Sequence, residues 1–85
     1  MGELSKLPNI GPDTERQLEA VGIETPAQLQ EVGSREAWLR IQRIDPSACI
    51  HRLMGLEGAL LGVKKSLLPP DVKAQLNAFY QSHKL

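Results

Sequence analysis

Apolar side chains recur every three or four residues along most of the chain, which is the spacing typical of α-helices. No run alternates apolar and polar positions as a half-buried strand would. Proline and glycine separate the helical runs, so these two residue types mark most of the helix ends. The pattern predicts an all-α fold, a compact bundle of five to six short helices in one domain over residues 1–85. The predicted helices are residues 2–6, 12–21, 26–33, 35–44, 47–63 and 71–81.

Several residues are well suited to the ends of these helices. Pro12 stands at the first position of the second helix, where a missing N–H costs nothing. Gly22 can take the left-handed conformation after the last turn, and Ile23 then folds back onto the helix. Thr25 and Gln28 have the spacing of a capping box. The N-terminal half is therefore predicted as two helices joined by tight turns.

The helix at 47–63 is predicted to be the centre of the fold, because it has no broad polar face. Its glycines cost about 1 kcal/mol each in helix propensity relative to alanine, so we expect them to let another backbone approach closely. The apolar residues expected to be buried there are Cys49, Ile50, Leu53, Met54, Leu56, Leu60 and Leu61.

Glu57 interrupts the apolar arc of this helix. An unpaired carboxylate is costly to remove from water, so Glu57 needs hydrogen-bond donors. We interpret it as a structural buried acceptor that receives backbone amides from the start of a neighbouring helix or pairs with an arginine.

A tight turn precedes the second helix and is the first candidate for a binding site. Its residues are Asn9, Ile10, Gly11 and Pro12. The turn resembles the hairpin of helix-hairpin-helix domains, in which a glycine, hydrophobic, glycine sequence presents amides to a DNA phosphate. Asn9 replaces the first glycine, and Asp13 and Glu15 add negative charge nearby. Both a phosphate-binding turn and a purely structural hairpin therefore stay open.

Charge is distributed unevenly, although the formal net charge is zero. Residues 1–33 contain two cationic and six acidic side chains, which gives a net charge of −4. The remainder contains eight cationic and four acidic side chains, which gives +4. Such asymmetry suits a basic binding face and equally suits two attracting halves. The candidate basic surface comprises Arg35, Arg40, Arg43, Lys64 and Lys65. Trp38 follows the helical spacing of Ala37 and Ile41 and is expected in the core, so it offers no platform for base stacking.

Catalytic and metal-binding patterns are missing from the sequence. Cys49 and His51 are two residues apart, which does not place two ligands on one helix face, and His83 is isolated. We therefore expect no enzyme, no cofactor and no small-molecule substrate. The single cysteine excludes an internal disulfide and, without a signal segment, points to the cytoplasm. No apolar run reaches the about 20 residues that a membrane span needs.

Five segments together resemble the TfoX C-terminal domain family. They are Leu7–Pro12, Leu18–Ile23, Thr25–Pro26, Leu56–Leu60 and Leu68–Pro70. The resemblance implies a compact all-helical domain of helix-hairpin-helix type, which in longer relatives follows a separate α/β domain in regulators of bacterial competence. Since Met1 stands just before the hairpin, we expect a stand-alone or excised domain.

The resulting functional hypothesis is a non-enzymatic interaction domain. We expect it to bind a protein partner or to self-associate, because the two halves of the chain carry opposite charge. The alternative is a nucleic-acid-binding helix-hairpin-helix module that contacts the phosphate backbone in a regulatory role. The two hypotheses predict different salt dependence, which is steep for the nucleic-acid module.

Overall fold

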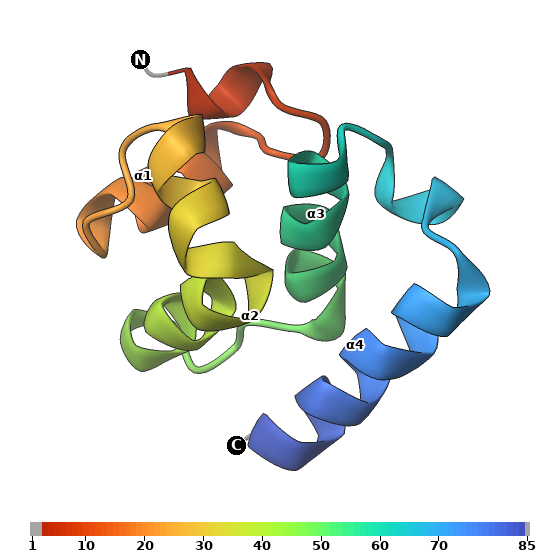
Figure 1. Cartoon of the computed structure of the whole chain (residues 1–85). Helices are drawn as coiled ribbons and strands as arrows, with labels where there is room; N and C mark the ends of the chain where they lie inside the picture. Colours follow the sequence, from red (N-terminus) through yellow and green to blue (C-terminus); the bar gives the residue numbers. More distant parts are fainter. Residues whose placement is uncertain (1–2, 85) are drawn as a thin grey trace.

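The computed structural model describes residues 3–84, and within this range the fold is entirely helical, as predicted. Figure 1 shows α3 near the middle of the molecule, with α1 and α2 on one side and α4 on the other. No helix within the described range is long and apolar enough to cross a membrane. The elements are η1 (Leu4–Lys6), α1 (Pro12–Ala20), α2 (Pro26–Ile44), α3 (Ile50–Leu61), η2 (Lys65–Leu67) and α4 (Pro70–His83), where η denotes a 3₁₀ turn.

The predicted number of helices is wrong, because residues 3–84 form four α-helices and two 3₁₀ turns. The segments predicted as 26–33 and 35–44 are one element, α2, which bends at Gly33. Gly33 has a φ of 86° and a ψ of 164°, a conformation that glycine adopts at little cost. The chain resumes its helical path directly after Gly33, so the expected helix end is a kink. The first predicted helix is only the short turn η1.

The central helix also begins later than predicted, at Ile50 in place of Ser47. Asp45 holds the preceding residues in a turn, because its carboxylate accepts hydrogen bonds from the backbone N–H and the hydroxyl of Ser47 at 3.1 and 2.5 Å. The backbone N–H of Ala48 donates to the Asp45 carbonyl at 3.0 Å. These local bonds compete with helix formation, as is common for aspartate and serine.

The predicted helix ends on either side of Gly22 are confirmed. Gly22 has a φ of 86°, and the N–H of Ile23 returns to the Leu18 carbonyl at 2.8 Å. The Thr25 hydroxyl accepts the N–H of Gln28 at 3.1 Å. The Gln28 side chain accepts the N–H of Glu24 at 2.6 Å, one residue before the partner of a standard capping box.

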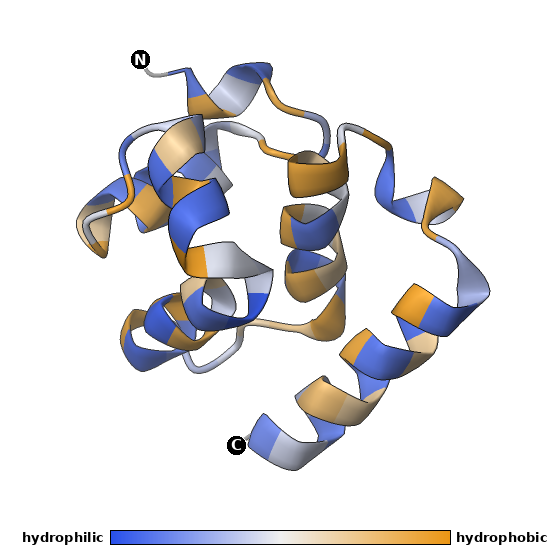
Figure 2. Cartoon of the chain, viewed as in Figure 1, coloured by the Kyte–Doolittle hydropathy of each residue, from blue (hydrophilic) through white to orange (hydrophobic). Residues whose placement is uncertain are grey.

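The core draws on every α-helix and on η1, and the prediction that Trp38 belongs to it is confirmed. Trp38 is 0% exposed and packs edge-on against Phe79 and Tyr80. Its indole N–H donates to the Cys49 carbonyl at 3.2 Å, which satisfies its polar atom. Figure 2 shows the apolar stripes on these helices. The buried apolar residues are Leu4, Ile10, Leu18, Ile23, Leu29, Ala37, Trp38, Ile41, Leu53, Leu56, Ala59, Leu68 and Leu76.

Two residues of the predicted buried arc are exposed. Cys49 lies before the first turn of α3 and faces solvent, so its interpretation as a core residue is wrong. Leu61 is the last residue of α3 and is 53% exposed. Both lie at the ends of the helix, beyond the part of α3 whose buried residues, Leu53 to Ala59, pack into the core.

Candidate functional site

The turn before α1 uses Asn9 in place of a glycine. Asn9 has a φ of 68°, and within residues 3–84 it is the one residue other than glycine whose φ is positive. Asparagine tolerates this left-handed conformation better than most residues do. The N–H of Ile10 donates to the Leu7 carbonyl at 3.4 Å, so this amide closes the turn.

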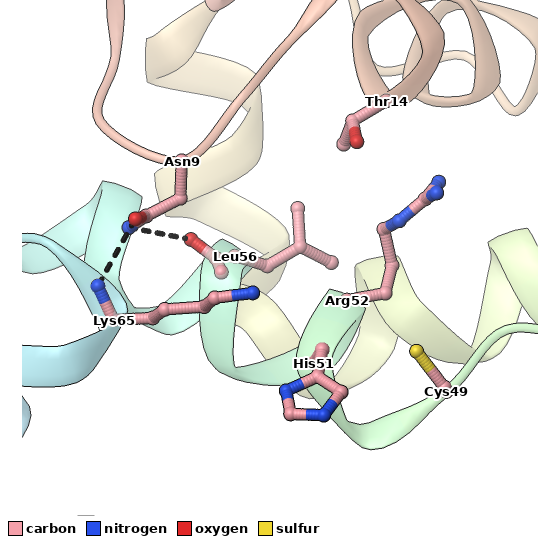
Figure 3. A pocket seen from close by; sticks show the side chains of 8 residues that line it. Asn9, Thr14, Cys49, His51, Arg52, Leu56 and Lys65 are labelled. Carbon is pink, nitrogen blue, oxygen red and sulfur yellow. Dashed lines mark hydrogen bonds between the residues drawn. The ribbon is translucent and has the colours of Figure 1, made fainter.

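The side chain of Asn9 ties the turn to the C-terminal part of α3. Its amide nitrogen donates to the Val63 carbonyl at 2.9 Å and to the Gly55 carbonyl at 3.4 Å. Its amide oxygen accepts the backbone N–H of Lys65 at 3.0 Å (Figure 3). The asparagine thus joins segments that are 54 and 56 residues apart in sequence.

This contact explains why α3 has a glycine at position 58. A Cβ atom on Gly58 would lie 2.6 Å from the amide nitrogen of Asn9 and 2.7 Å from the Val63 carbonyl oxygen. A Cβ atom on Gly55 would lie 3.4 Å from the Cβ of Asn9, which is an ordinary contact. The prediction that glycines in this helix permit a close backbone approach is confirmed at Gly58.

The two carboxylates of the first turn of α1 have different surroundings. Asp13 is exposed and pairs with Arg16. Glu15 is 7% exposed and accepts the backbone N–H of Ser5 at 3.1 Å. Glu15 therefore holds the turn η1 against α1, a role that no local signal in the sequence indicates.

A hollow of about 300 Å³ lies beside the Asn9 turn, and we call it the α1–α3 hollow. Figure 3 shows its side chains arriving from the Asn9 turn, α1, the start of α3 and η2. Asn9 and Lys65 are candidate site residues from the sequence, whereas no sequence pattern connects them with His51, Arg52 or Thr14. The residues that line the hollow are Asn9, Thr14, Cys49, His51, Arg52, Gly55, Leu56 and Lys65.

The cations proposed as a basic surface have separate surroundings. The Nε atom of Arg40 donates to Glu36 at 2.9 Å, the i,i+4 pair that the sequence contains. The guanidinium of Arg35 lies 5.9 Å from the ring centroid of Phe79. The remaining members, Arg43, Lys64 and Lys65, are exposed, and Lys65 lines the α1–α3 hollow.

Glu57 is half-buried and accepts a hydrogen bond from the Ser34 hydroxyl, with 2.5 Å between Ser34 Oγ and Glu57 Oε1. Ser34 is 3% exposed and directly follows the bend at Gly33. This donor is a hydroxyl group, whereas the donor predicted from the sequence was a backbone amide or an arginine. The contact joins α3 to the bend in α2.

A polar network links α1 to the turn before α3. The Gln17 side chain donates to Asp45 at 2.8 Å and accepts a hydrogen bond from Arg52. The hydroxyl of Ser47 lowers the pKa of Asp45 most, followed by the Gln17 amide, the Ser47 N–H and the charge of Arg52. Each of these groups stabilises the ionised carboxylate.

Within residues 3–84, no three His, Cys, Asp or Glu side chains lie close enough together to hold a metal ion.

Comparisons with known proteins place the chain among a recognised group. A family model described as the TfoX C-terminal domain matches residues 1–80. The chain is 33% identical over 73 residues to Protein Sxy of Escherichia coli (strain K12), a match that covers 86% of this chain and 35% of Sxy. The chain thus matches about a third of the length of this curated relative.

Two crystal structures of proteins from Listeria monocytogenes have the same fold. One, titled an uncharacterized protein in a triclinic form, shares 47% identity with a TM-score of 0.92 and covers 93% of this chain and 90% of its own. The other, titled a protein of unknown function in a tetragonal form, shares 46% identity with a TM-score of 0.92 and covers 94% and 98%. Both structures therefore support the fold of this chain and assign it no activity.

Proposed function

Because the chain belongs to the TfoX C-terminal domain family, we propose that it is a regulatory domain without enzymatic activity that works by binding another protein. The similarity to Sxy supports a domain of the competence-regulator kind. The match covers only 35% of Sxy, so a role of this chain in competence is proposed and does not follow from the similarity alone. The cytoplasmic location stays a prediction from the sequence.

The observation that carries the proposal is an exposed apolar and basic segment, residues 61–67, at the end of α3. Leu61 is 53% exposed and Leu67 is 68% exposed, and both Lys64 and Lys65 between them are exposed. Gly62 ends α3 in a left-handed conformation, and η2 then packs back against that helix. Large apolar side chains held in water beside cations are typical of a binding surface.

The composition of this segment favours an acidic partner with an apolar centre. Burial of a leucine side chain on binding contributes about 1.5 to 3 kcal/mol, and lysines at the rim favour carboxylates on the other surface. Residues 1–33 carry a net charge of −4, so the acidic part of a second copy of the chain is the alternative partner for this basic segment. We propose a different protein as the partner, and the experiment distinguishes it from a second copy.

The test compares two variants that replace exposed apolar side chains by serine at different places on the surface. Leu61→Ser combined with Leu67→Ser removes the apolar part of the segment, and Ile44→Ser removes an equally exposed apolar residue, 53%, at the end of α2. We expect a partner co-purified from the native cells and identified by mass spectrometry to be lost with the double variant and kept with Ile44→Ser. Equal retention by both variants would refute the proposal. Dimers in analytical ultracentrifugation that the double variant abolishes would instead identify a second copy.

Nucleic-acid binding is the second candidate function, and the contact between Asn9 and Lys65 favours it. The backbone N–H of Lys65 donates to Asn9, so an exposed lysine lies beside the Asn9 turn. The bond from Ile10 to the Leu7 carbonyl, however, occupies one of the amides that the hairpin hypothesis uses.

A duplex DNA titration at low and physiological salt tests this candidate. Phosphate contacts predict binding that weakens steeply with salt and is lost when Lys64 and Lys65 or Arg40 and Arg43 are replaced by glutamate. Absence of binding at low salt would exclude it.

A further inference from the structure

The side chains around the α1–α3 hollow carry groups that attract anions, and none of the lining residues is acidic. Lys65 and Arg52 are cations, and the His51 ring can donate hydrogen bonds. We propose that this hollow binds a phosphate group. The proposal does not depend on the protein-binding proposal, because Leu61 and Leu67 are not part of the hollow.

The placement of the cations supports a site that is built from several elements. In Figure 3 the ammonium of Lys65 extends across the hollow toward α3, and the guanidinium of Arg52 points toward Thr14. Among residues 3–84, the Lys65 ammonium and the His51 ring make no hydrogen bond or ion pair. These two groups are therefore available to a ligand without breaking a contact of the fold.

Arg52 is held in place by its neighbours. It donates to Gln17, which in turn donates to Asp45 at 2.8 Å. A guanidinium has five N–H donors, so a bond to Gln17 leaves others for an oxyanion. The polar network thus fixes one cation of the site before a ligand arrives, which lowers the entropy cost of binding. The charge of Arg52 also stabilises the Asp45 carboxylate of this network, so Arg52 supplies hydrogen-bond donors while Lys65 supplies the uncompensated charge.

The start of α3 adds a second source of positive potential. Cys49, the residue before the first turn, makes no side-chain hydrogen bond to the amides of α3, and the first turn holds no acidic residue. In α1, by contrast, Asp13 and Glu15 lie in the first turn. Because Cys49 and His51 line the hollow, the first amides of α3 lie beside it. The N–H of Arg52 already donates to the Cys49 carbonyl at 3.1 Å, so the amides that this end of α3 offers are those of Ile50 and His51.

The size of the hollow fits a phosphate with a substituent. About 300 Å³ lies at the lower end of the range for small-molecule sites, which is more than a single phosphate fills. Asn9 and Thr14 add polar side chains from the turn before α1 and from α1 itself. The phosphate of a mononucleotide and that of a nucleic-acid strand share this chemistry.

The experiment is an NMR titration of the ¹⁵N-labelled chain with pyrophosphate, in buffers of constant ionic strength. We expect the amide signals of Thr14, His51 and Arg52 to shift. Lys65→Gln should weaken binding about tenfold, as for the loss of one charge-assisted hydrogen bond. Its backbone N–H remains to bond Asn9, so the variant keeps the turn in place.

Lys64→Gln is the matched control, since Lys64 is an exposed neighbouring lysine that does not line the hollow. We expect it to change the pyrophosphate affinity by less than about twofold, as for a screened surface charge. Equal weakening by both variants would show diffuse charge attraction and overturn the proposal, as would an absence of shifts at millimolar pyrophosphate.

Two further ligands distinguish the sources of the phosphate. Adenosine monophosphate that shifts the same amides, while a short duplex DNA does not, would assign the hollow to a small phosphorylated molecule. Duplex DNA that shifts these amides and depends on Lys65 more than on Lys64 would assign it to a nucleic-acid backbone. Both results support a phosphate site.

Discussion

Replacing Gly58 by alanine is expected to lower the free energy of unfolding by about 2 to 4 kcal/mol, although alanine is the better helix former. A Cβ atom at this position would lie 2.6 Å from the Asn9 amide nitrogen, 2.7 Å from the Val63 carbonyl oxygen and 3.3 Å from the Lys65 backbone nitrogen. Two of these three atoms belong to the backbone. The added methyl group must therefore displace the Asn9 turn or the segment that follows α3.

The magnitude follows from the contacts that would be lost. The Asn9 side chain bonds to Val63 at 2.9 Å and to Lys65 at 3.0 Å, and each bond contributes about 1 kcal/mol. Crowding of a packed site adds about 1 to 3 kcal/mol, and the better helix propensity of alanine offsets about 1 kcal/mol. For a domain of this size the net loss lowers the thermal midpoint by at least about 8 °C.

Thermal and urea unfolding followed by circular dichroism measure this effect, with Gly55→Ala as the control. A Cβ atom on Gly55 meets the Asn9 Cβ at 3.4 Å, so this variant should be unchanged or up to about 1 kcal/mol more stable. Equal stability of the two variants would refute the close-approach argument. In an Asn9→Ala background, Gly58→Ala should lower the free energy of unfolding by less, because the amide nitrogen of Asn9 is no longer there to collide with the added Cβ.

Two further predictions concern polar contacts that lie elsewhere in the fold. Glu57→Gln keeps an acceptor for the buried Ser34 hydroxyl, whereas Glu57→Leu removes it, so we expect the leucine variant to be less stable by about 1 to 3 kcal/mol in thermal unfolding. Identical midpoints would contradict that role for Glu57. Because hydrogen bonds from Ser47 and Gln17 hold the pKa of Asp45 below its ordinary value of 3.8, its stabilising effect is complete above pH 3.8 and is lost as the pH falls through the lowered value. Ser47→Ala should raise the Asp45 pKa toward 3.8 in a ¹³C NMR titration, and an unchanged pKa would show that Ser47 is not the main cause.

The sequence by itself determined the features that depend on neighbouring residues. The spacing of apolar positions gave the helical class and placed Trp38 in the core, and the motifs around Gly22 and Thr25 gave two helix ends. Each of these signals acts within about one helical turn. The family also followed from the sequence, since its motifs keep a fixed order along the chain.

The tertiary structure alone decided which distant groups meet. Asn9 bonds Lys65 across 56 residues, and Glu15 turns inward to Ser5 because η1 packs against α1. Local patterns carry no information on such pairs, so the sequence could predict that Gly58 faces a close neighbour but not that Asn9 is that neighbour. The α1–α3 hollow likewise exists only after the Asn9 turn, α1, α3 and η2 have packed together, since its lining residues come from all four segments.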